Sequence, residues 1–481
     1  MPTTYTDRAA ADAILKDFFL GPIRDQLNSE TILAYRLQKN EEIVEGRYVV
    51  MPLHTGRNVG IMSRRESGVV ANGSNLPVAG RQGWTDMRFL VRYNYGRIKM
   101  TGPVMASART NRGAFARVVD EEVKGLVRDL KNDLNRQYWG DGSGRIGIIK
   151  AITPNAPIAG QTTFNVKEPW DVADQAPSLK WFQVGDRIVA EDITAGAGTT
   201  VLVGMTNASA TSQEVIGVNL KAKTITVSGV GGGAPEAGVG DAIVRAYDVG
   251  VPVSGGVGIS NLRGVTGGIA NQASDMMGLV GITSGDVSSN WTRSSVLYNP
   301  VPTGQVYAGA PSGVYTYADL QGVSAAATTY WAANTNFNGG VPRPLTTDLM
   351  QQSMDEAELK GQATATIALG SYSVRRAYVN LLTADRRYVN EYELDGGFKA
   401  VDFNGIPLVP EKDAPEGTIF FLSEPNLGIA RMSDFYWLDK DGAILSRVSG
   451  VDEWDAILAY YAELYTDRRN AHSVLGDIAI N

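Results

Sequence analysis

Residues 111–139 read NRGAFARVVDEEVKGLVRDLKNDLNRQYW, and this stretch predicts one long amphipathic helix. Its apolar side chains recur three and four positions apart, the spacing of a single helical stripe, and charged residues such as Arg136 fall on the other face. At 1.5 Å per residue the helix would be a rod of about 45 Å. Thr110 or Asn111 can cap its start, and Gly140 stands where a left-handed residue ends a helix. A rod with one apolar stripe needs a partner along that stripe, and we expect a sheet.

Length and composition indicate a globular protein with more than one core. The chain has 481 residues, enough for roughly two to four subdomains. It contains no cysteine, which excludes disulfides and thiolate metal sites. No apolar run reaches the roughly 18 residues of a membrane span, and acidic residues near the N-terminus argue against a signal peptide. We therefore expect an intracellular protein with no membrane partner.

The net charge of −7 is unevenly distributed along the chain. Residues 46–112 carry eleven basic and two acidic residues, a local balance of +9, whereas residues 345–481 carry twelve basic and twenty-two acidic residues, a balance of −10. A basic segment in an acidic protein can bind nucleic acid. It can also be an arm that lies on the acidic half of a neighbouring copy. We favour the arm, because glycine and proline spread the arginines along an extended segment.

Two segments precede the long helix. Residues 4–20 predict a short amphipathic helix, and residues 46–101 alternate strand-like pieces with a Gly-, Asn-, Ser- and Pro-rich tract at 67–83. A two-stranded hairpin is marginal in water, so we expect another subunit to stabilise this one. There is no lysine between Lys39 and Lys99, and arginine suits multidentate ion pairs across interfaces. The candidate intersubunit contacts are Arg57, Arg64, Arg65, Arg81, Arg88 and Arg92.

A glycine-rich turn and a series of short strands follow the long helix. Gly142, Gly144 and Gly147 have the G-x-G-x-x-G spacing of a dinucleotide site, but they leave a helix instead of opening one, so we predict a plain turn. Between residues 181 and 248, β-branched strands recur about every ten residues, which is typical of a small barrel or sandwich inserted into the chain. The segments VGDRIVA (184–190) and VGDAIVR (239–245) are similar, but two copies of so short a motif do not establish a repeat.

The C-terminal part predicts a compact α/β region after a long, weakly charged stretch at 249–344. Thr346 or Thr347 can cap a helix that ends at Gly361. The other expected elements are a strand in 363–369, a helix at 374–389, hairpins turning at Asn404-Gly405 and at Asp441-Gly442, and a long closing strand that includes 457–465.

Motifs for chemistry are missing from the sequence. The chain has two histidines, His54 and His472, and a calcium-loop fragment at 439–442 that lacks the glutamate expected at loop spacing. No nucleophile elbow, phosphate loop or zinc-protease motif occurs. We therefore predict no catalytic, cofactor-binding or metal site. Paired glycosidase carboxylates cannot be recognised without geometry, so a carbohydrate-active enzyme with a β module stays as a remote alternative.

Several stretches resemble the major capsid proteins of tailed bacteriophages, which have the Hong Kong 97-like fold. They are VPRPLTTDLMQQSMDEAELKG (341–361), FNGIPLVPEKDAPEGTIFFL (403–422), ARMSDFYWLDKDGAILSRVSGVDEWDA (430–456), TDRRNAHSVLGDI (466–478) and the MMGLVGI segment. The resemblance implies an α+β fold with an N-terminal arm (1–45), an E-loop (46–101), a peripheral domain (102–165) with a spine helix (111–139), an inserted small β-barrel or sandwich domain (166–255), an extended loop region (256–344), an axial domain (345–450) and a closing strand of the peripheral domain (451–481).

The resemblance also implies a function. The chain would self-assemble as hexamers and pentamers into the icosahedral head of a double-stranded DNA phage, located in the virion and made in the host bacterial cytoplasm. Some family members link an E-loop lysine to an asparagine of another subunit, and the absence of lysine between 39 and 99 argues against that cross-link here. Because only residues 1–45 precede the E-loop, we expect a separate scaffolding protein, with a portal and a possible decoration protein as further partners. An encapsulin-type cellular compartment, which shares the fold, is the alternative.

Overall fold

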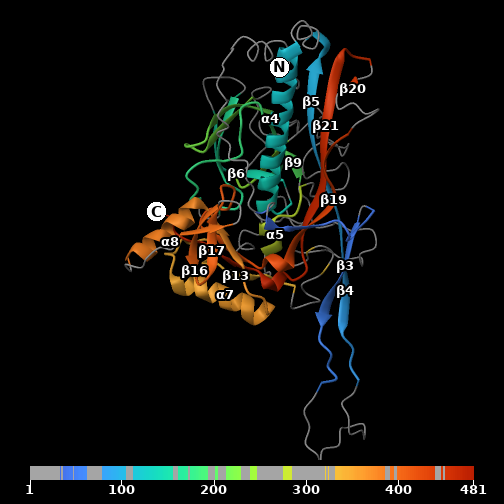
Figure 1. Cartoon of the computed structure of the whole chain (residues 1–481). Coiled ribbons are helices and arrows are strands. Elements are labelled where there is room, and N and C mark those ends of the chain that lie inside the picture. The colour runs from blue at the N-terminus through green and yellow to red at the C-terminus, as the bar shows by residue number, and fades with distance from the viewer. Residues whose placement is uncertain are drawn as a thin grey trace, which may run out of the picture.

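The computed structural model describes residues 33, 36–46, 48–61, 79–103, 112–142, 144–154, 161–171, 174–192, 201–203, 213–228, 239–245, 275–283, 320, 323, 331–384, 391–394, 398–438, 446–447 and 450–480. The helix expected at 4–20 and the turn expected at Asp441-Gly442 lie outside them. Figure 1 shows the described parts: a projecting hairpin, a long helix beside a sheet, a strand-rich region behind that helix, and an α/β layer at its lower end.

The predicted long helix is α4 (Arg112–Trp139), and β5 (Arg92–Thr101) is its neighbour. Gly96 of β5 faces Leu126, and a Cβ at Gly96 would come within 2.9 Å of that leucine, so glycine permits the close approach of helix and strand. Residues 134–139 are all buried. The helix is therefore enclosed on all sides at its C-terminal end, and Arg136 lies inside the protein although the sequence pattern places it on the polar face.

The sheet beside α4 is built around β21 (Glu453–Thr466), which confirms the predicted long closing strand. One edge of β21 pairs with β5, and the other pairs with β19 (Leu427–Trp437) and with β20 (Ser446–Arg447). A short strand, β1 (Gln38–Asn40), runs parallel to β19. The sequence predicts a hairpin between the segments that form β19 and β20, but the described residues of both pair with β21 instead.

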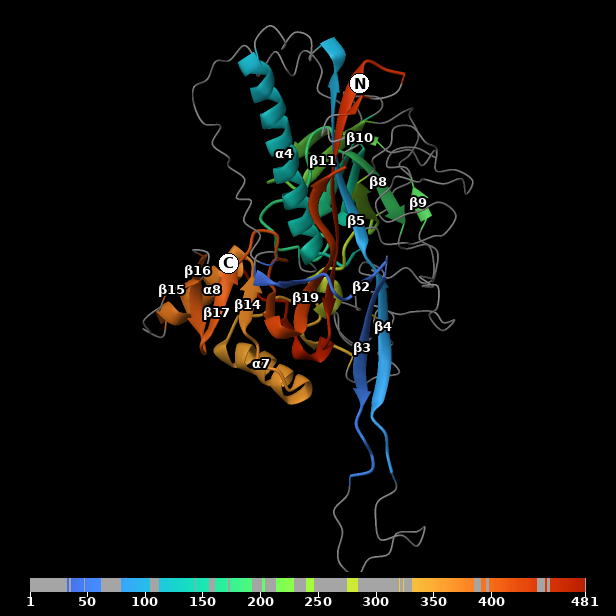
Figure 2. The same cartoon turned by 45° about the vertical axis from the view of Figure 1, so that its right-hand side comes forward.

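The projecting hairpin consists of β3 (Tyr48–Gly56) and β4 (Gly83–Leu90), with β2 (Val44–Glu45) paired to the start of β3. Both views show it leaving the body as a narrow two-stranded arm (Figures 1 and 2). The residues after it, which the sequence interpretation includes in the E-loop, form β5 and belong to the sheet around β21.

The α/β layer contains a seven-stranded sheet flanked by α7 (Thr347–Gly361) and α8 (Tyr372–Ala384). In spatial order its strands are β13 (Asn334–Asn336), β22 (Ser473–Leu475), β18 (Ile419–Leu422), β14 (Ile367–Gly370), β17 (Ile406–Pro410), β16 (Phe398–Phe403) and β15 (Glu391–Leu394). The edge strand β13 and its neighbour β22 lie outside residues 345–450, whereas β19 and β20 lie within that range but join the other sheet. The two sheets therefore interleave in sequence, with short 3-10 helices η1 (Glu424–Asn426) and η2 (Arg469–Ala471) at the crossings.

A closed barrel follows α4. Its strands are β6 (Arg145–Pro154), β7 (Gln161–Lys167), β8 (Arg187–Asp192), β10 (Gln213–Asn219), β11 (Thr224–Ser228) and β12 (Ala242–Arg245), with β9 (Val201–Val203) added outside the ring. The ring closes because β8 pairs with β10 as well as with β12. The barrel begins at β6 and not at residue 166, the start expected from the sequence, because β6 and β7 are two of its six strands.

Turn residues follow the sequence predictions in part. Asn404 and Gly405 have φ of 51° and 82°, which suits the predicted tight hairpin turn. The Thr346 hydroxyl accepts a hydrogen bond from the Leu349 amide at 3.2 Å, so Thr346 caps the start of α7 as predicted. The left-handed residues at the helix ends are not those predicted. Gln362 follows α7 in that conformation, whereas Gly361 is the last helical residue and lies too close to the Asn470 backbone for a Cβ.

The region after α4 differs in the same way. The left-handed conformation falls on Gly142 and Gly144, with φ of 84° and 80°, and not on Gly140. These glycines lead into β6, so the G-x-G-x-x-G motif is a helix-to-strand turn, as predicted. Taken together, the chain has the α+β fold class predicted from the sequence, with a projecting hairpin, a long helix, an inserted barrel, an α/β layer and a long closing strand.

Candidate assembly interface

The described part of the projecting hairpin that lies furthest from the body exposes large apolar side chains. Val59 is 79% exposed, Ile61 is 84% exposed, and Trp84 is 63% exposed. The Trp84 ring stands edge-on to His54 with ring centroids 5.1 Å apart, and His54 Nε2 is 2.6 Å from Gln82 Oε1. These contacts fix the tryptophan on one side of the arm. Exposed large apolar side chains gathered on a narrow arm, away from the body, are typical of a surface that contacts another molecule.

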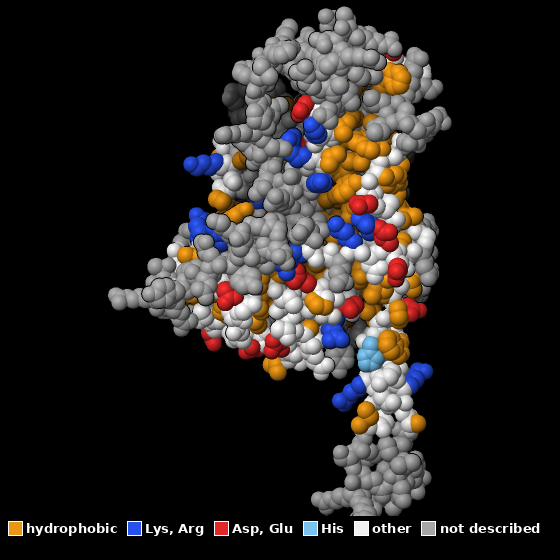
Figure 3. Space-filling view, viewed as in Figure 1, with side chains coloured by type: hydrophobic (Ala, Val, Ile, Leu, Met, Phe, Trp, Pro, Cys, Tyr) orange, Lys and Arg blue, Asp and Glu red, His pale blue; other side chains and the backbone are white. Residues whose placement is uncertain are grey.

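The structure divides the six candidate arginines into three groups. Arg57 and Arg81 lie on the hairpin, are exposed, and have no ion-pair or hydrogen-bond partner among the described residues. Figure 3 shows basic side chains on the arm next to apolar ones. Arg92 is half-buried in β5, with its Nε 3.7 Å from the carboxylate of Glu463 in the same chain. Arg64, Arg65 and the side chain of Arg88 lie outside what the structure describes.

An acidic surface lies on the body, on α7. Asp348, Asp355 and Glu358 are exposed along this helix, and Leu359 beside them is 81% exposed. In Figure 3 acidic side chains gather along the lower edge of the body, where Figure 1 places α7. The chain thus presents exposed cations on the arm and exposed anions on a separate surface of the body.

The sheet around β21 has a second exposed surface, on the side opposite α4. Tyr93, Tyr95, Tyr436 and Tyr461 meet there, with Tyr461 edge-on to each of the other three rings. The Tyr95 and Tyr461 hydroxyls are 3.1 Å apart, and partial burial together with hydrogen bonding among the rings raises the Tyr461 pKa well above its usual value. The cross-strand ion pair between Arg97 and Asp455, at 2.7 Å, continues the same face.

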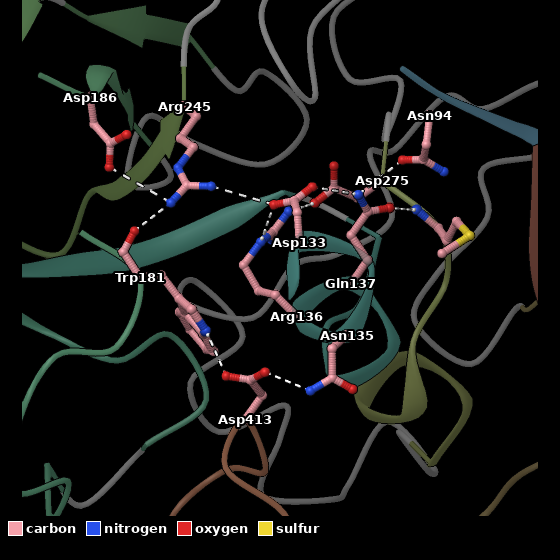
Figure 4. Close-up of polar contacts among 11 residues, drawn as sticks. Asn94, Asp133, Asn135, Arg136, Gln137, Trp181, Asp186, Arg245, Asp275 and Asp413 are labelled. Carbon is pink, nitrogen blue, oxygen red and sulfur yellow. Dashed lines mark hydrogen bonds and ion pairs between the residues drawn. The ribbon is translucent and has the colours of Figure 1, made fainter. Parts of the chain in front are cut away.

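A buried polar junction holds the parts of the subunit together at the C-terminal end of α4 (Figure 4). Asn135 donates to Asp413 of the α/β layer at 2.6 Å. Arg136 pairs with Asp275 at 2.6 Å, and Gln137 both donates to Asn94 of β5 and accepts from the Met276 amide. Three consecutive residues of one helix together contact three other segments, which are the α/β layer, β5 and residues 275–276. The helical pattern cannot reveal this, because it records only the alternation of polar and apolar residues.

The barrel attaches to the same junction. The Trp181 indole donates to Asp413 at 3.1 Å, and Arg245 donates to the Trp181 carbonyl at 2.5 Å. The Arg245 guanidinium also lies 3.4 Å from Asp133 of α4 and 3.7 Å from Asp186 of the barrel (Figure 4). Asp413 thus receives bonds from both the spine helix and the barrel, so the junction joins three parts of the chain.

Several titratable groups are buried in the body. Burial raises the pKa of Glu463 to about 8, although Arg92 and the Met277 amide oppose the shift. Burial also raises the pKa of Glu168 to about 7 against the opposing effect of Lys180, and lowers the pKa of His472 to about 4. Both His472 ring nitrogens have partners, the Ser423 amide and the Thr466 hydroxyl. Glu463 and His472 therefore favour their neutral forms near neutral pH and are structural groups.

Raising the pH from about 5 to 9 should lower the stability of the subunit, and Glu463→Gln should weaken this dependence. A carboxyl whose pKa is about 8 in the folded protein, against 4.5 normally, contributes stability that is complete below pH 4.5 and is lost as the pH rises through 8. The upper limit of this contribution is about 5 kcal/mol. The measurement is the melting temperature at several pH values. Glu41→Gln, at an exposed acid, is the control, and an unchanged slope in Glu463→Gln would contradict the assignment.

The described residues contain no group of three or more His, Asp or Glu side chains that could hold a metal ion. No helix in the described part is both long enough and apolar enough to cross a membrane.

Comparison with known proteins finds matches only among solved structures. No protein-family model and no curated protein matches the chain. The cyanophage A-1(L) capsid is 12% identical over 95% of each chain with a TM-score of 0.48, and a structure of Mycobacterium phage Adephagia is 9% identical over 99% of each with a TM-score of 0.43. The encapsulin SrpI of Synechococcus elongatus PCC 7942 is 18% identical but covers 30% of this chain and 52% of its own, with a TM-score of 0.24. None of these similarities identifies a functional residue.

Proposed function

We propose that this chain is the major capsid protein of a tailed double-stranded DNA bacteriophage and self-assembles into its icosahedral head. The observation that carries the proposal is the arm formed by β3 and β4. It projects from the body and exposes Trp84, Val59 and Ile61 beside Arg57 and Arg81. A two-stranded arm of this kind gains stability when a neighbour covers it.

A second copy of the chain has the chemistry that this arm requires. The exposed acids of α7, Asp348, Asp355 and Glu358, offer counter-charges to Arg57 and Arg81, and Leu359 offers apolar surface. The arm and α7 are different surfaces, so the contact is heterologous, and heterologous contacts repeat from copy to copy into rings when the rotation closes. Hexamers and pentamers are the rings from which a closed shell is built.

The role is structural and not enzymatic. The partners in this role are further copies of the chain, a separate scaffolding protein, a portal and a decoration protein, and the site of action is the virion after synthesis in the bacterial cytoplasm. The shell would enclose double-stranded DNA without sequence-specific contacts. A net charge of −7 supports this, because a surface with few excess cations releases few counterions from DNA and therefore binds DNA weakly.

Negative-stain imaging of the expressed chain, alone and with a scaffolding protein, tests the proposal. Closed shells of uniform diameter are expected. Particles from infected cells should contain nuclease-protected double-stranded DNA, whereas a cellular compartment of the encapsulin type would contain protein cargo instead. A chain that elutes as a monomer under all these conditions would contradict the proposal.

A further inference from the structure

Two Val-Gly-Asp turns occupy equivalent places in the barrel. One precedes β8 and contains Gly185, and the other precedes β12 and contains Gly240. Both glycines have positive φ, 94° and 102°, which side chains rarely adopt. The Gly185 amide donates to the Val215 carbonyl at 2.8 Å, and the Gly240 amide donates to the Ile149 carbonyl at 2.8 Å.

The return bonds match as well. The Val215 amide donates to the carbonyl of Asp186 at 2.8 Å, and the Ile149 amide donates to the carbonyl of Asp241 at 2.9 Å. The aspartates are the third residues of the two turns. Each turn is therefore held to the strand beside it by the same pair of backbone bonds, β8 to β10 in one case and β12 to β6 in the other.

Strand register extends the equivalence to the whole ring. A register shift follows Ile149 in β6, where it faces Val166 of β7, and another follows Val215 in β10, where it faces Val227 of β11. The pairing of β8 with β10 matches that of β12 with β6. Strand β7 pairs with its counterpart β11, and β8 pairs with its counterpart β12.

The register also places two residue pairs on the symmetry axis that relates the halves. Phe164 faces Ile225, and these two residues are each other's counterparts in the two halves. The same is true of Val189 and Val244, which also face each other. All four side chains are buried. A pseudo-two-fold axis therefore passes through these two ladders.

We infer that the barrel is an internal duplication, made of two copies of one unit of two strands, a Val-Gly-Asp turn and a third strand. The copies are β6–β7–β8 and β10–β11–β12. They are intertwined, because the third strand of each copy pairs with the first strand of the other, so neither copy can close a barrel alone. The chain enters at Arg145 and leaves beside it, since Arg145 is opposite Val244, and such a module can be inserted after α4 without displacing its flanks.

The two copies have diverged in the connection between the second strand and the turn. In the first copy this connection docks on the α/β layer, where Trp181 donates to Asp413, Lys180 donates to the Ala414 carbonyl at 3.1 Å, and Gln175 donates to the Ile478 carbonyl at 3.0 Å (Figure 4 shows the Trp181 bond). The corresponding connection of the second copy, residues 229–238, lies outside the described residues. Among the described residues, these bonds from the barrel to the α/β layer come from the first copy, and Arg245 at the end of the second copy pairs with Asp133 of α4.

A reciprocal exchange in the full chain tests the duplication. Phe164→Ile and Ile225→Phe should each lower the melting temperature of the barrel, by about 5 °C or more, because one leaves a cavity and the other overpacks the core. The double variant should recover to within about 2 °C of the original, since the two positions exchange across the axis. Losses that add in the double variant would overturn the inference.

Hydrogen exchange measured by segment tests the intertwining and the docking. Gly185→Ala and Gly240→Ala, at the two left-handed positions, should each raise exchange in strands of both copies, and Gly217→Ala, which has room for a Cβ, is the control. An increase confined to the mutated copy would contradict two interdependent halves.

Trp181→Phe tests the docking of the barrel. This variant should raise hydrogen exchange around Asp413 while leaving both barrel copies protected, and loss of protection throughout the barrel would contradict the docking role.

Discussion

Reversing the charges of Arg57 and Arg81 together, to glutamate, is expected to abolish shell assembly and to leave the subunit folded. Both side chains are exposed on the arm and have no partner among the described residues, so we expect their reversal to leave the stability of the isolated subunit nearly unchanged. Across an interface with the acids of α7, the reversal replaces attraction by repulsion. A loss of about 2 kcal/mol per contact would weaken each contact about thirty-fold. Every subunit repeats the contact, so the shell loses it throughout.

Sedimentation and negative-stain imaging measure assembly, and circular dichroism measures folding. Lys221→Glu is the matched control, because Lys221 is also exposed but lies in a barrel turn. The control should assemble normally. A second, compensating variant carries Asp355→Lys and Glu358→Lys on α7 in addition, and it should recover part of the assembly. Normal shells from the arginine double variant would remove the arm-to-neighbour contact from the proposal.

The second large effect is expected at Arg469, where Arg469→Met should destabilise the subunit by about 3–5 kcal/mol. The guanidinium is fully buried and donates to three backbone carbonyls, those of Ile282 at 2.8 Å, Gly281 at 3.2 Å and Trp331 at 3.3 Å. The first two belong to α5 (Leu279–Thr283), which packs under the end of α4. Methionine fills much of the volume but donates nothing, so these carbonyls would be left without this donor.

The neighbouring residue provides the control for this prediction. Arg468 is exposed and donates to the Gly361 carbonyl at 3.2 Å, so Arg468→Met should cost less than about 1 kcal/mol. Urea denaturation followed by tryptophan fluorescence measures both variants. Equal stabilities of the two variants would contradict a structural role for the buried guanidinium.

Local patterns were sufficient to predict most elements of this fold. The stripe at residues 111–139 predicts α4, the alternation around 457–465 predicts β21, and Asn404-Gly405 predicts a tight hairpin turn. Each depends on interactions between residues close in sequence, which are helical periodicity, strand alternation and the backbone conformations open to asparagine and glycine. The arm also follows from its arginines and its turn-rich tip. Its docking surface on a neighbour stays a prediction.

Contacts between segments that are distant in the chain could not be predicted from the sequence patterns. Arg136 and Arg469 look like surface residues of a helix and a loop, yet both are buried, because segments distant in the chain close over them. The range 345–450 expected for the α/β layer omits β13 and β22, which join its sheet. The repeated Val-Gly-Asp motif was too short to identify a repeat. The repeat is supported by the structure, in which both copies make the same backbone hydrogen bonds and have register shifts at equivalent positions.

The amino-acid sequence alone determined the kinds of elements, their order, the absence of cysteine chemistry and the separation of a basic arm from an acidic body. The tertiary structure alone decided which strands pair, which charged side chains are buried, and that the barrel is a closed ring of two equivalent halves. The physical reason is the range of the interactions. Periodicity and turn preference depend on residues that are close together in the sequence. Strand register and the burial of Arg136, Asn135 and Arg469 depend on surfaces that meet only after the chain has folded.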